Sequence, residues 1–228
     1  MKKYAMLCLK SFLTAIVLAG LSGCALLDPG PPPAQVIMPI QQKVARESNR
    51  MPASILVDHP IADGAAGSDR ILALLNGYEV RALDRAKWVS PVPWMVQRLI
   101  IDALEASRRL ESVGWEESVS DATIKLQTDI RRFFLRYDAV DKPPVADLTI
   151  IFSLVDMQTS RTFGRTVVSV EQQCQGNSVA EFVAAYTLGM TKVLNQSSEW
   201  VLRSIEEHLG QTVKAAKEAP PEGRKRVS

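Results

Sequence analysis

The chain has 228 residues, of which 27 are basic and 25 acidic, so its formal net charge is +2. This near balance gives no electrostatic case for nucleic-acid binding, which needs clustered positive charge. The length suffices for one domain of ordinary size with tails at its ends.

Residues 1–23 have the layout of a secretory signal peptide. Lys2, Lys3 and Lys10 precede an uncharged, mostly apolar stretch over residues 11–21. A basic start before a short apolar run is typical of such a signal. The stretch has about half of the roughly 20 apolar residues that a membrane-spanning helix needs. We therefore expect a cleaved signal peptide and no transmembrane anchor.

Leu21-Ser22-Gly23-Cys24 resembles the lipobox of bacterial lipoproteins. The small residues give the peptidase access to the bond, and the thiol of Cys24 accepts the diacylglycerol. Cleavage leaves Cys24 as the new N-terminus, where a further acyl chain can be added. Each buried CH₂ contributes about 0.8 kcal/mol, so two or three chains anchor the protein firmly. The alternative is an ordinary secreted protein with a chance cysteine, but the position, spacing and upstream charge favour the lipoprotein.

Ala25 follows the cysteine that is expected to be lipidated. In enteric-type sorting an aspartate at this position retains a lipoprotein in the inner membrane. By that resemblance Ala25 directs the chain to the outer membrane, with its domain facing the periplasm. Loss of the signal peptide removes three lysines and changes the formal charge from +2 to −1. It also removes Cys8, so Cys174 has no partner for an intrachain disulfide once Cys24 is acylated.

The rest of the chain divides into a tether, a domain and a tail. Residues 24–50 include Pro29-Gly30-Pro31-Pro32-Pro33 and are expected to form a lipidated tether, because proline favours extended polyproline geometry. Residues 51–209 form the expected domain. Residues 210–228 are polar and are expected to be disordered, with weak attraction of their basic end to anionic surfaces as the alternative.

The first half of the domain predicts a strand, a hairpin and a helix. The apolar run over residues 53–57 predicts a buried strand. Two strand-like runs over 70–75 and 78–83 flank Asn76-Gly77, and the tolerance of this pair for positive φ is the typical signal of a hairpin. An apolar stripe at helical spacing, entered through a proline, predicts a helix over about residues 94–111.

Three long strands are predicted in the second half. Apolar and polar residues alternate over 123–137, 146–157 and 162–172, which is typical of a sheet with one face on a core. Trp115 is expected on a short strand before them.

A second helix is predicted over residues 178–209. Ser178 and Glu181 suit a capping box at its start, and Gly189 is a candidate position for a kink. This order of elements predicts an α/β (α+β) fold, a two-layer sandwich in which two long helices cover one face of a mostly antiparallel sheet of about five to six strands.

The chain carries no recognisable catalytic or metal-binding constellation. Its two histidines, His59 and His208, cannot form a tetrahedral zinc site without several carboxylates. Asp58 beside His59 could be imagined as catalytic, but the adjacent Glu116 and Glu117 would point to opposite faces of a strand. Neither a phosphate loop nor a G-x-S-x-G elbow is present. We therefore expect no enzyme activity, no cofactor and no metal.

Several short motifs follow one another along the chain: Ile55-Leu56-Val57, Asp69-Arg70-Ile71, Tyr78 and Val80 in the hairpin, and Trp88-Val89-Ser90-Pro91-Val92-Pro93 before the first helix. Together with the long strands and the last helix, this arrangement is similar to the ABC-type transport auxiliary lipoproteins, the paraquat-inducible protein C-like group, across residues 36–209. The resemblance implies a periplasm-facing auxiliary lipoprotein of the outer membrane.

The resemblance also implies partners. These would be a mammalian-cell-entry (MCE) domain protein, a permease and a cytoplasmic ATPase, which together move phospholipids or other apolar molecules between the two membranes. A chain without a phosphate loop does not suit the ATPase role, and one without a spanning helix does not suit the permease. The sequence leaves open the cargo and a homo-oligomer. The alternative function is an outer-membrane assembly or export lipoprotein for lipopolysaccharide or polysaccharide.

The segment over residues 88–94 is the candidate partner-binding site. Trp88, Pro91, Pro93 and Trp94 would make it rigid and apolar, and tryptophan is enriched in interface hot spots. The alternative is that both tryptophans cover the core beside the helix start, because large aromatic side chains are mostly buried.

Overall fold

The computed structural model describes residues 31–43, 49–116, 118–139 and 141–218. The expected signal peptide over residues 1–23, the lipidation site Cys24 and residues 219–228 lie outside this range. One compact unit begins at Ala34. Within the described residues, no helix has the length and apolar character needed to cross a membrane.

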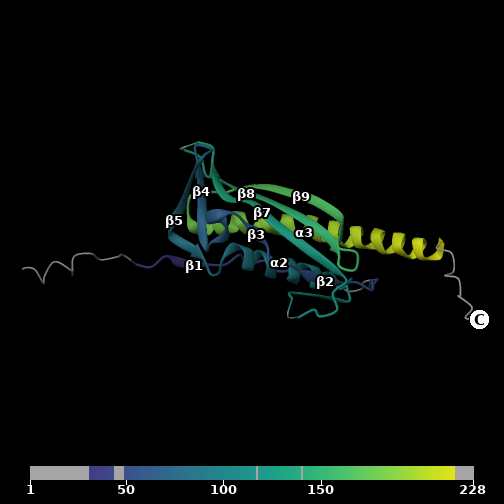
Figure 1. Ribbon diagram of the computed structural model, residues 1–228. Coiled ribbons are helices and arrows are strands. Elements are labelled where there is room, and N and C mark those ends of the chain that lie inside the picture. The colour runs from purple at the N-terminus through teal and green to yellow at the C-terminus, as the bar shows by residue number, and fades with distance from the viewer. Residues whose placement is uncertain (1–30, 44–48, 117, 140, 219–228) are drawn as a thin grey trace, which may run out of the picture. The chain divides into compact units, whose positions relative to one another are not determined.

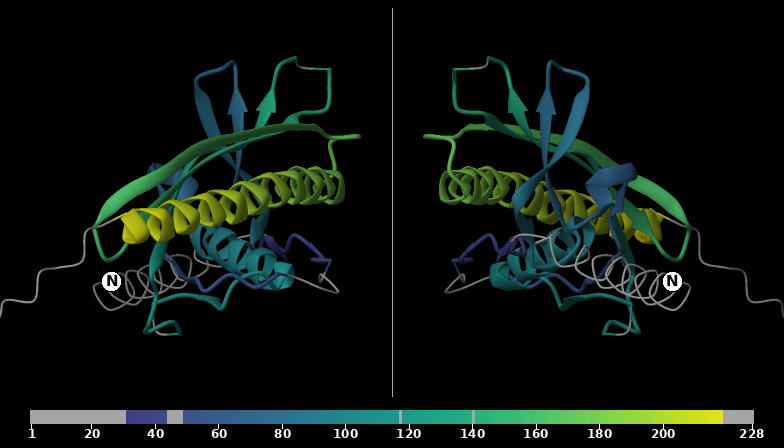
Figure 2. Two further views of the ribbon diagram at one scale, coloured as in Figure 1. Left: turned by 90° about the vertical axis from the view of Figure 1, so that its right-hand side faces the viewer. Right: turned by 90° about the vertical axis from the view of Figure 1, so that its left-hand side faces the viewer.

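In the described part of the chain, one mixed sheet and two long helices make up the fold (Figure 1). The nine strands described are β1 (Ala34–Val36), β2 (Ser54–Val57), β3 (Ile61–Ala62), β4 (Arg70–Leu75), β5 (Glu79–Trp88), β6 (Ser112–Gly114), β7 (Ile124–Tyr137), β8 (Val145–Asp156) and β9 (Arg161–Gln173). The helices are η2 (Gly64–Gly67), α2 (Val92–Ser107) and α3 (Val179–Glu218). Both long helices lie on one side of the sheet (Figure 2), which confirms the predicted two-layer α/β class.

Strand β7 forms the centre of the sheet. On one side it pairs antiparallel with β8 along most of its length, and β8 pairs antiparallel with β9. On the other side the short strands β2, β3 and β4 pair with it in succession, all parallel. β6 continues the sheet beyond β2, and β5 and β1 continue it beyond β4. Most paired residues therefore lie in antiparallel ladders, as the alternation of the long strands predicts.

The sheet has more strands than the sequence predicts. The additional strands β1 and β3 have only three and two residues, too few to show the alternation from which a strand is recognised. The short strand expected at Trp115 is present as β6, which ends one residue before it, at Gly114.

Ordered structure also begins earlier than residue 51. β1 lies inside the expected tether and pairs parallel with β5, with Val36 opposite Trp88. The side chain of Met38, just after β1, is only 6% exposed. The physical reason is that β5 would otherwise present an unpaired edge, to which an extended segment can bind through its main chain.

The predicted hairpin joins β4 to β5. Asn76 and Gly77 form its turn with φ angles of 54° and 76°, so this prediction is confirmed. β5 then continues to Trp88, further than the strand-like pattern suggests.

Helix α2 begins and ends a few residues before its predicted bounds. It starts at Val92, with Pro91 as its N-cap and Pro93 in its first turn, where the missing N–H leaves no helical bond unmade. It ends at Ser107 because Arg108 adopts the left-handed conformation, with φ of 55°. The N–H of Arg108 donates to the carbonyl oxygen of Glu105 at 3.0 Å.

Helix α3 begins with the predicted capping box. The main-chain N–H of Glu181 donates to Ser178 Oγ at 3.3 Å, and the main-chain N–H of Ser178 donates to Glu181 Oε2 at 2.9 Å. Two donors that the helix leaves unpaired are thereby satisfied. The N–H of Ser178, and then its hydroxyl, hold the pKa of Glu181 below its ordinary value of 4.5.

Helix α3 then runs unbroken to Glu218, so the predicted end at residue 209 is wrong, and residues 210–218 are helical instead of disordered. No proline occurs in this segment before Pro220, and adding residues to an existing helix is favourable. The helix is continuous through Gly189, the candidate position for a kink. A Cβ atom there would lie 3.0 Å from Leu148 Cδ1, so this glycine allows α3 to approach β8 closely.

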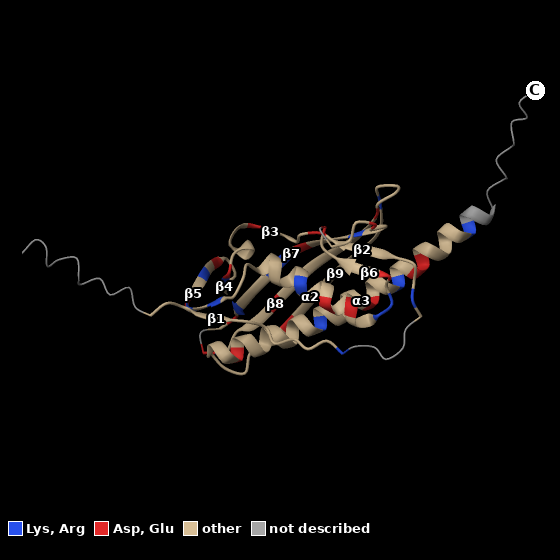
Figure 3. Cartoon of the chain, turned by 90° about the horizontal axis from the view of Figure 1, so that it is seen from below, with Lys and Arg blue, Asp and Glu red and all other residues tan. Residues whose placement is uncertain are grey.

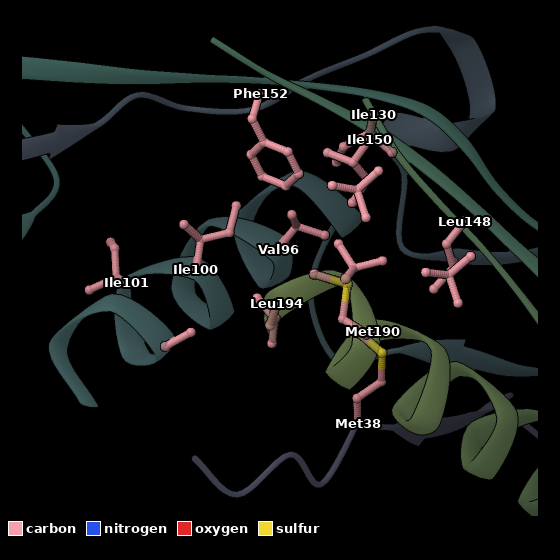
Figure 4. Close-up of a cluster of buried hydrophobic side chains, with 14 of the residues drawn as sticks. Met38, Val96, Ile100, Ile101, Ile130, Leu148, Ile150, Phe152, Met190 and Leu194 are labelled. Atoms are coloured by element: carbon pink, nitrogen blue, oxygen red, sulfur yellow. The ribbon is translucent and has the colours of Figure 1, made fainter. Parts of the chain in front are cut away.

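The hydrophobic core lies between the sheet and the two long helices. Figure 4 shows Ile150 and Phe152 of β8 facing Val96 of α2 and Met190 of α3. All four side chains are buried. Burial of this apolar surface, at about 25 cal/mol per Å², is the main force holding the two layers together.

An aromatic cluster connects β5, β7 and α3. The ring centroid of Tyr186 lies 5.1 Å from that of Trp88 and 5.0 Å from that of Phe133. Trp88 and Tyr186 are both fully buried, and burial raises the pKa of Tyr186 well above its ordinary value. The last residue of β5 is thus fixed to the middle of the core.

We expect Ser178→Ala to lower the free energy of unfolding by about 1 kcal/mol, because an N-cap acceptor is lost. Urea denaturation followed by circular dichroism measures the change. Since the folded-state pKa of Glu181 is lowered, the stabilisation from its pairing is present at neutral pH and is lost as the pH falls through that pKa. Ser204→Ala, the same substitution inside α3, is the control and should be neutral or slightly stabilising. Equal effects of the two variants would contradict the capping role.

Candidate functional site

A half-open groove of about 410 Å³ lies where β2 ends beside α2. Its lining residues come from three separate parts of the chain: Leu56, Val57, Asp58, His59, Trp94, Gln97, Arg98, Trp115 and Glu116. Sites for small ligands occupy about 300–1,000 Å³ and combine apolar walls with a few polar groups. The groove has the size and the composition of a binding site.

The floor of the groove is fixed by one buried hydrogen bond. β6 pairs with β2 only as far as Leu56, which lies opposite Gly114. The next carbonyl, that of Val57, therefore has no strand partner on this side, and Gln97 Nε2 donates to it at 2.9 Å. Gln97 is only 5% exposed. This bond locks α2 against the end of β2 and holds the groove in shape.

Two exposed tryptophans form the walls. Trp94, in the first turn of α2, is 59% exposed, and Trp115, just after β6, is 39% exposed. The ring of His59 lies 4.4 Å from that of Trp94, and the guanidinium carbon of Arg98 lies 5.8 Å from the ring centre of Trp115. Each indole is thus supported on one side by a neighbouring side chain while it remains accessible to a ligand. Such exposure is unusual for the largest aromatic side chain.

The charged side chains around the groove differ in whether they form close ion pairs. Arg98 Nε lies 2.9 Å from Asp102 Oδ1, so the positive charge of Arg98 is already paired. Asp58 makes only a long contact of 3.8 Å with Lys125. Glu116 is exposed and has no ion pair among the described residues. The charge that remains available at the rim is therefore negative, whereas acidic and basic residues are interspersed along the described parts of α2 and α3 (Figure 3).

The structure separates the four residues predicted to bind a partner. Trp94 lines the groove, and Pro91 is exposed beside it. Trp88 is fully buried and Pro93 is buried as well, so neither is available to a partner, and their prediction as contact residues is wrong. The reason is that β5 extends to Trp88, and the alternation of a strand directs this side chain into the core.

Sequence reasoning missed most of the groove. Trp115, Arg98 and Gln97 were not predicted as site residues, and Asp58 and His59 were considered only as catalytic groups. In the structure His59 packs on Trp94, and the main-chain N–H of His59 donates to Asp58 Oδ1 at 3.1 Å. No group of three potential metal ligands occurs in the described part of the chain.

The remaining reactive side chains have structural roles. Cys174, just after β9, is 2% exposed, and burial raises the pKa of its thiol to about 11. His208 Nε2 lies 3.0 Å from Asp156 Oδ2, and its ring stacks on Phe163 with a centroid distance of 3.9 Å. The Thr159 N–H, and then His208, lower the pKa of Asp156. These contacts hold α3 against the turn between β8 and β9.

The face of β7, β8 and β9 that points away from the two long helices carries a network of ion pairs. Asp147 is 1% exposed, and its Oδ2 lies 2.8 Å from Arg136 Nη1. Arg136 also pairs with Glu171 and Asp138, each at 2.8 Å. Glu171 first, and then Asp138, hold the pKa of Arg136 above its ordinary range. The charges of this network satisfy one another, so it is a weaker candidate for a binding site than the groove.

Comparison with known proteins adds a family and a fold. Residues 37–196 match the family model described as "ABC-type transport auxiliary lipoprotein component". A solved protein from Xanthomonas campestris is 21% identical, with a TM-score of 0.69 over 75% of this chain and 95% of that one. A second structure, of an uncharacterised protein, is 14% identical, with a TM-score of 0.54 over 72% of this chain and 99% of that one. No protein of curated function matches the sequence.

We expect Trp88→Ala and Trp94→Ala to differ in their effect on the free energy of unfolding. Trp88→Ala should lower the free energy of unfolding by about 3–5 kcal/mol, because it empties a buried site. Trp94→Ala should change it by no more than about 0.5 kcal/mol, as is usual for exposed positions. Chemical denaturation of both variants measures the difference. If Trp94→Ala were as destabilising as Trp88→Ala, the indole of Trp94 would be part of the core and not an accessible wall.

Proposed function

Because the chain belongs to the family of ABC-type transport auxiliary lipoprotein components, we propose that it is the auxiliary subunit of an MCE-type ABC transport system. The family match over residues 37–196 carries this proposal, and it confirms the resemblance drawn from the sequence motifs. In the proposed system an MCE-domain protein, a permease and an ATPase move phospholipids or other apolar molecules across the envelope. This chain contributes neither ATP hydrolysis nor the membrane pathway.

The proposed attachment is to the outer membrane on its periplasmic side. Acyl chains on Cys24 supply an apolar anchor whose strength grows with each buried CH₂, and Ala25 supports sorting to the outer membrane. Ten residue steps separate Cys24 from Ala34, where the compact unit begins. Because a chain extends by at most about 3.5 Å per residue, the acylated residue keeps this unit within about 35 Å of the membrane surface.

Besides an anchor, an auxiliary subunit needs a surface that binds a partner, and we propose that the groove is this surface. Its two exposed tryptophans are the side chains most enriched in binding hot spots, and the buried bond from Gln97 to Val57 holds the groove in shape before a partner arrives. A pre-formed surface loses less conformational entropy on binding than a mobile one. We therefore assign the partner-binding role to the groove, with Trp94 and Trp115 as its main contacts.

Lipid attachment can be tested with two cysteine variants of the full chain. We expect the mass of the native protein to include fatty acids on Cys24, and Cys24→Ser to shift the protein from the membrane fraction to the soluble periplasmic fraction. Cys174→Ser is the matched control and should remain with the membranes, because this thiol is buried in the domain. A native protein whose mass shows no fatty acid on Cys24 would exclude the acyl anchor.

The transport role is tested by purification of the tagged, lipidated chain from its native envelope. We expect the MCE-domain protein, the permease and the ATPase to co-purify with it, and Trp94→Ala to lower their yield at least tenfold. Tyr78→Ala is the control, because Tyr78 is an even more exposed aromatic residue, at the distant hairpin tip. Recovery of an outer-membrane export barrel in place of these subunits would favour the alternative role in polysaccharide or lipopolysaccharide export.

A further inference from the structure

The groove lies where β2 loses its strand neighbour on one side of the sheet. β2 has a neighbour on both sides only through Leu56, because β6 ends at Gly114. Beyond this point β7 still covers one side, where the N–H of Asp58 donates to the carbonyl oxygen of Leu126. On the other side the side chain of Gln97, which is only 5% exposed, takes the place of a strand and donates to the carbonyl oxygen of Val57. Because this carbonyl already has a partner, an occupant of the groove is recognised through the side chains that line it.

The walls suit a peptide with apolar side chains. Trp94 and Trp115 come from different elements and present indole rings from two sides of the same groove. Their supporting contacts with His59 and Arg98 fix their orientation. The groove is half open, which suits a chain segment lying along it better than an acyl chain that must be enclosed.

The charge of the rim decides which peptide fits. Asp58 and Glu116 both border the groove, and neither has a close ion pair among the described residues. The positive charge of Arg98 is held by Asp102 at 2.9 Å. Tryptophan faces also attract cations, as the position of Arg98 over Trp115 illustrates. Both observations favour a positively charged occupant.

We propose that this groove binds an extended segment of a partner subunit that carries lysine or arginine next to apolar residues. The identity of the partner as a transport subunit rests on the proposed function, but the chemistry of the segment rests on the groove alone. The apolar residues pack between Trp94 and Trp115, and the basic side chains pair with Asp58 and Glu116. The segment lies beside the end of β2, where β6 stops.

Photo-crosslinking in the native envelope tests this inference. A photoreactive benzophenone amino acid replaces Trp94 in the full, lipidated chain, so an aromatic group remains at the wall. The same amino acid at Tyr78, which is 82% exposed at the hairpin tip, serves as the control. We expect at least tenfold more adduct from position 94, and mass spectrometry should map it to a partner segment containing lysine or arginine.

Charge variants make the test specific. With the photoreactive group at position 94, Asp58→Asn together with Glu116→Gln should lower the adduct yield at least fivefold. Asp84→Asn together with Glu111→Gln removes two exposed acids that do not line the groove and should leave the yield unchanged. High salt should lower the adduct yield of the chain that keeps Asp58 and Glu116, because exposed charges are screened. It should have little effect on the yield of the variant in which both acids are neutralised.

Several outcomes would overturn the inference. These are an adduct with a lipid, an adduct with a second copy of this chain, an adduct with a segment lacking basic residues, or a yield at position 94 equal to that at Tyr78. The same envelopes distinguish this failure from failure of the proposed function. If the MCE-domain protein still co-purifies with the chain, the transport role stands and only the assignment of the groove falls.

Discussion

The pairing of β7 on both sides is the constraint on which the rest of the structure depends. Main-chain polar groups that leave water must find partners, and a strand of 14 residues carries many of them. β8 satisfies one side over twelve paired positions, while β2, β3 and β4 divide the other side among them. The register with β7 therefore places β2, β3 and β4 directly, and β6 through its pairing with β2. It sets Val57 opposite Leu126, and so decides where β2 ends and where the groove begins.

The pairing of the strands also determines which tryptophans are buried. β5 is held by β4 and ends at Trp88, whose ring meets Tyr186 in the core. α2 starts four residues later, and its first turn directs Trp94 away from that core. Two aromatic residues six positions apart thus lie in opposite environments, one in the core and one exposed at the groove. Gln97, one turn further along α2, joins the helix to the end of β2, so the packing that stabilises the fold also shapes the groove.

The proposed function combines two kinds of attachment that differ in their physics. The acyl chains on Cys24 bind through the hydrophobic effect, which has no direction and identifies a membrane but not a partner. The groove is directional, because its two indoles and its acidic rim must be matched at once. In the proposed function the anchor confines the chain to the envelope and the groove selects a subunit within it.

The sequence by itself determined the features that depend on a few neighbouring residues. Alternation located the long strands β7, β8 and β9, the Asn76-Gly77 pair located the hairpin, and Ser178 with Glu181 located the start of α3, because these signals act within one turn or one strand. Only the tertiary structure decided that the very short strands β1 and β3 join the sheet, that α3 continues to Glu218, and that Trp88 is buried while Trp94 is exposed. The groove could not be predicted from the sequence for the same reason. Residues 56–59, 94–98 and 115–116 meet only through the register of β2 with β6 and β7, and no local pattern specifies which strand pairs with which.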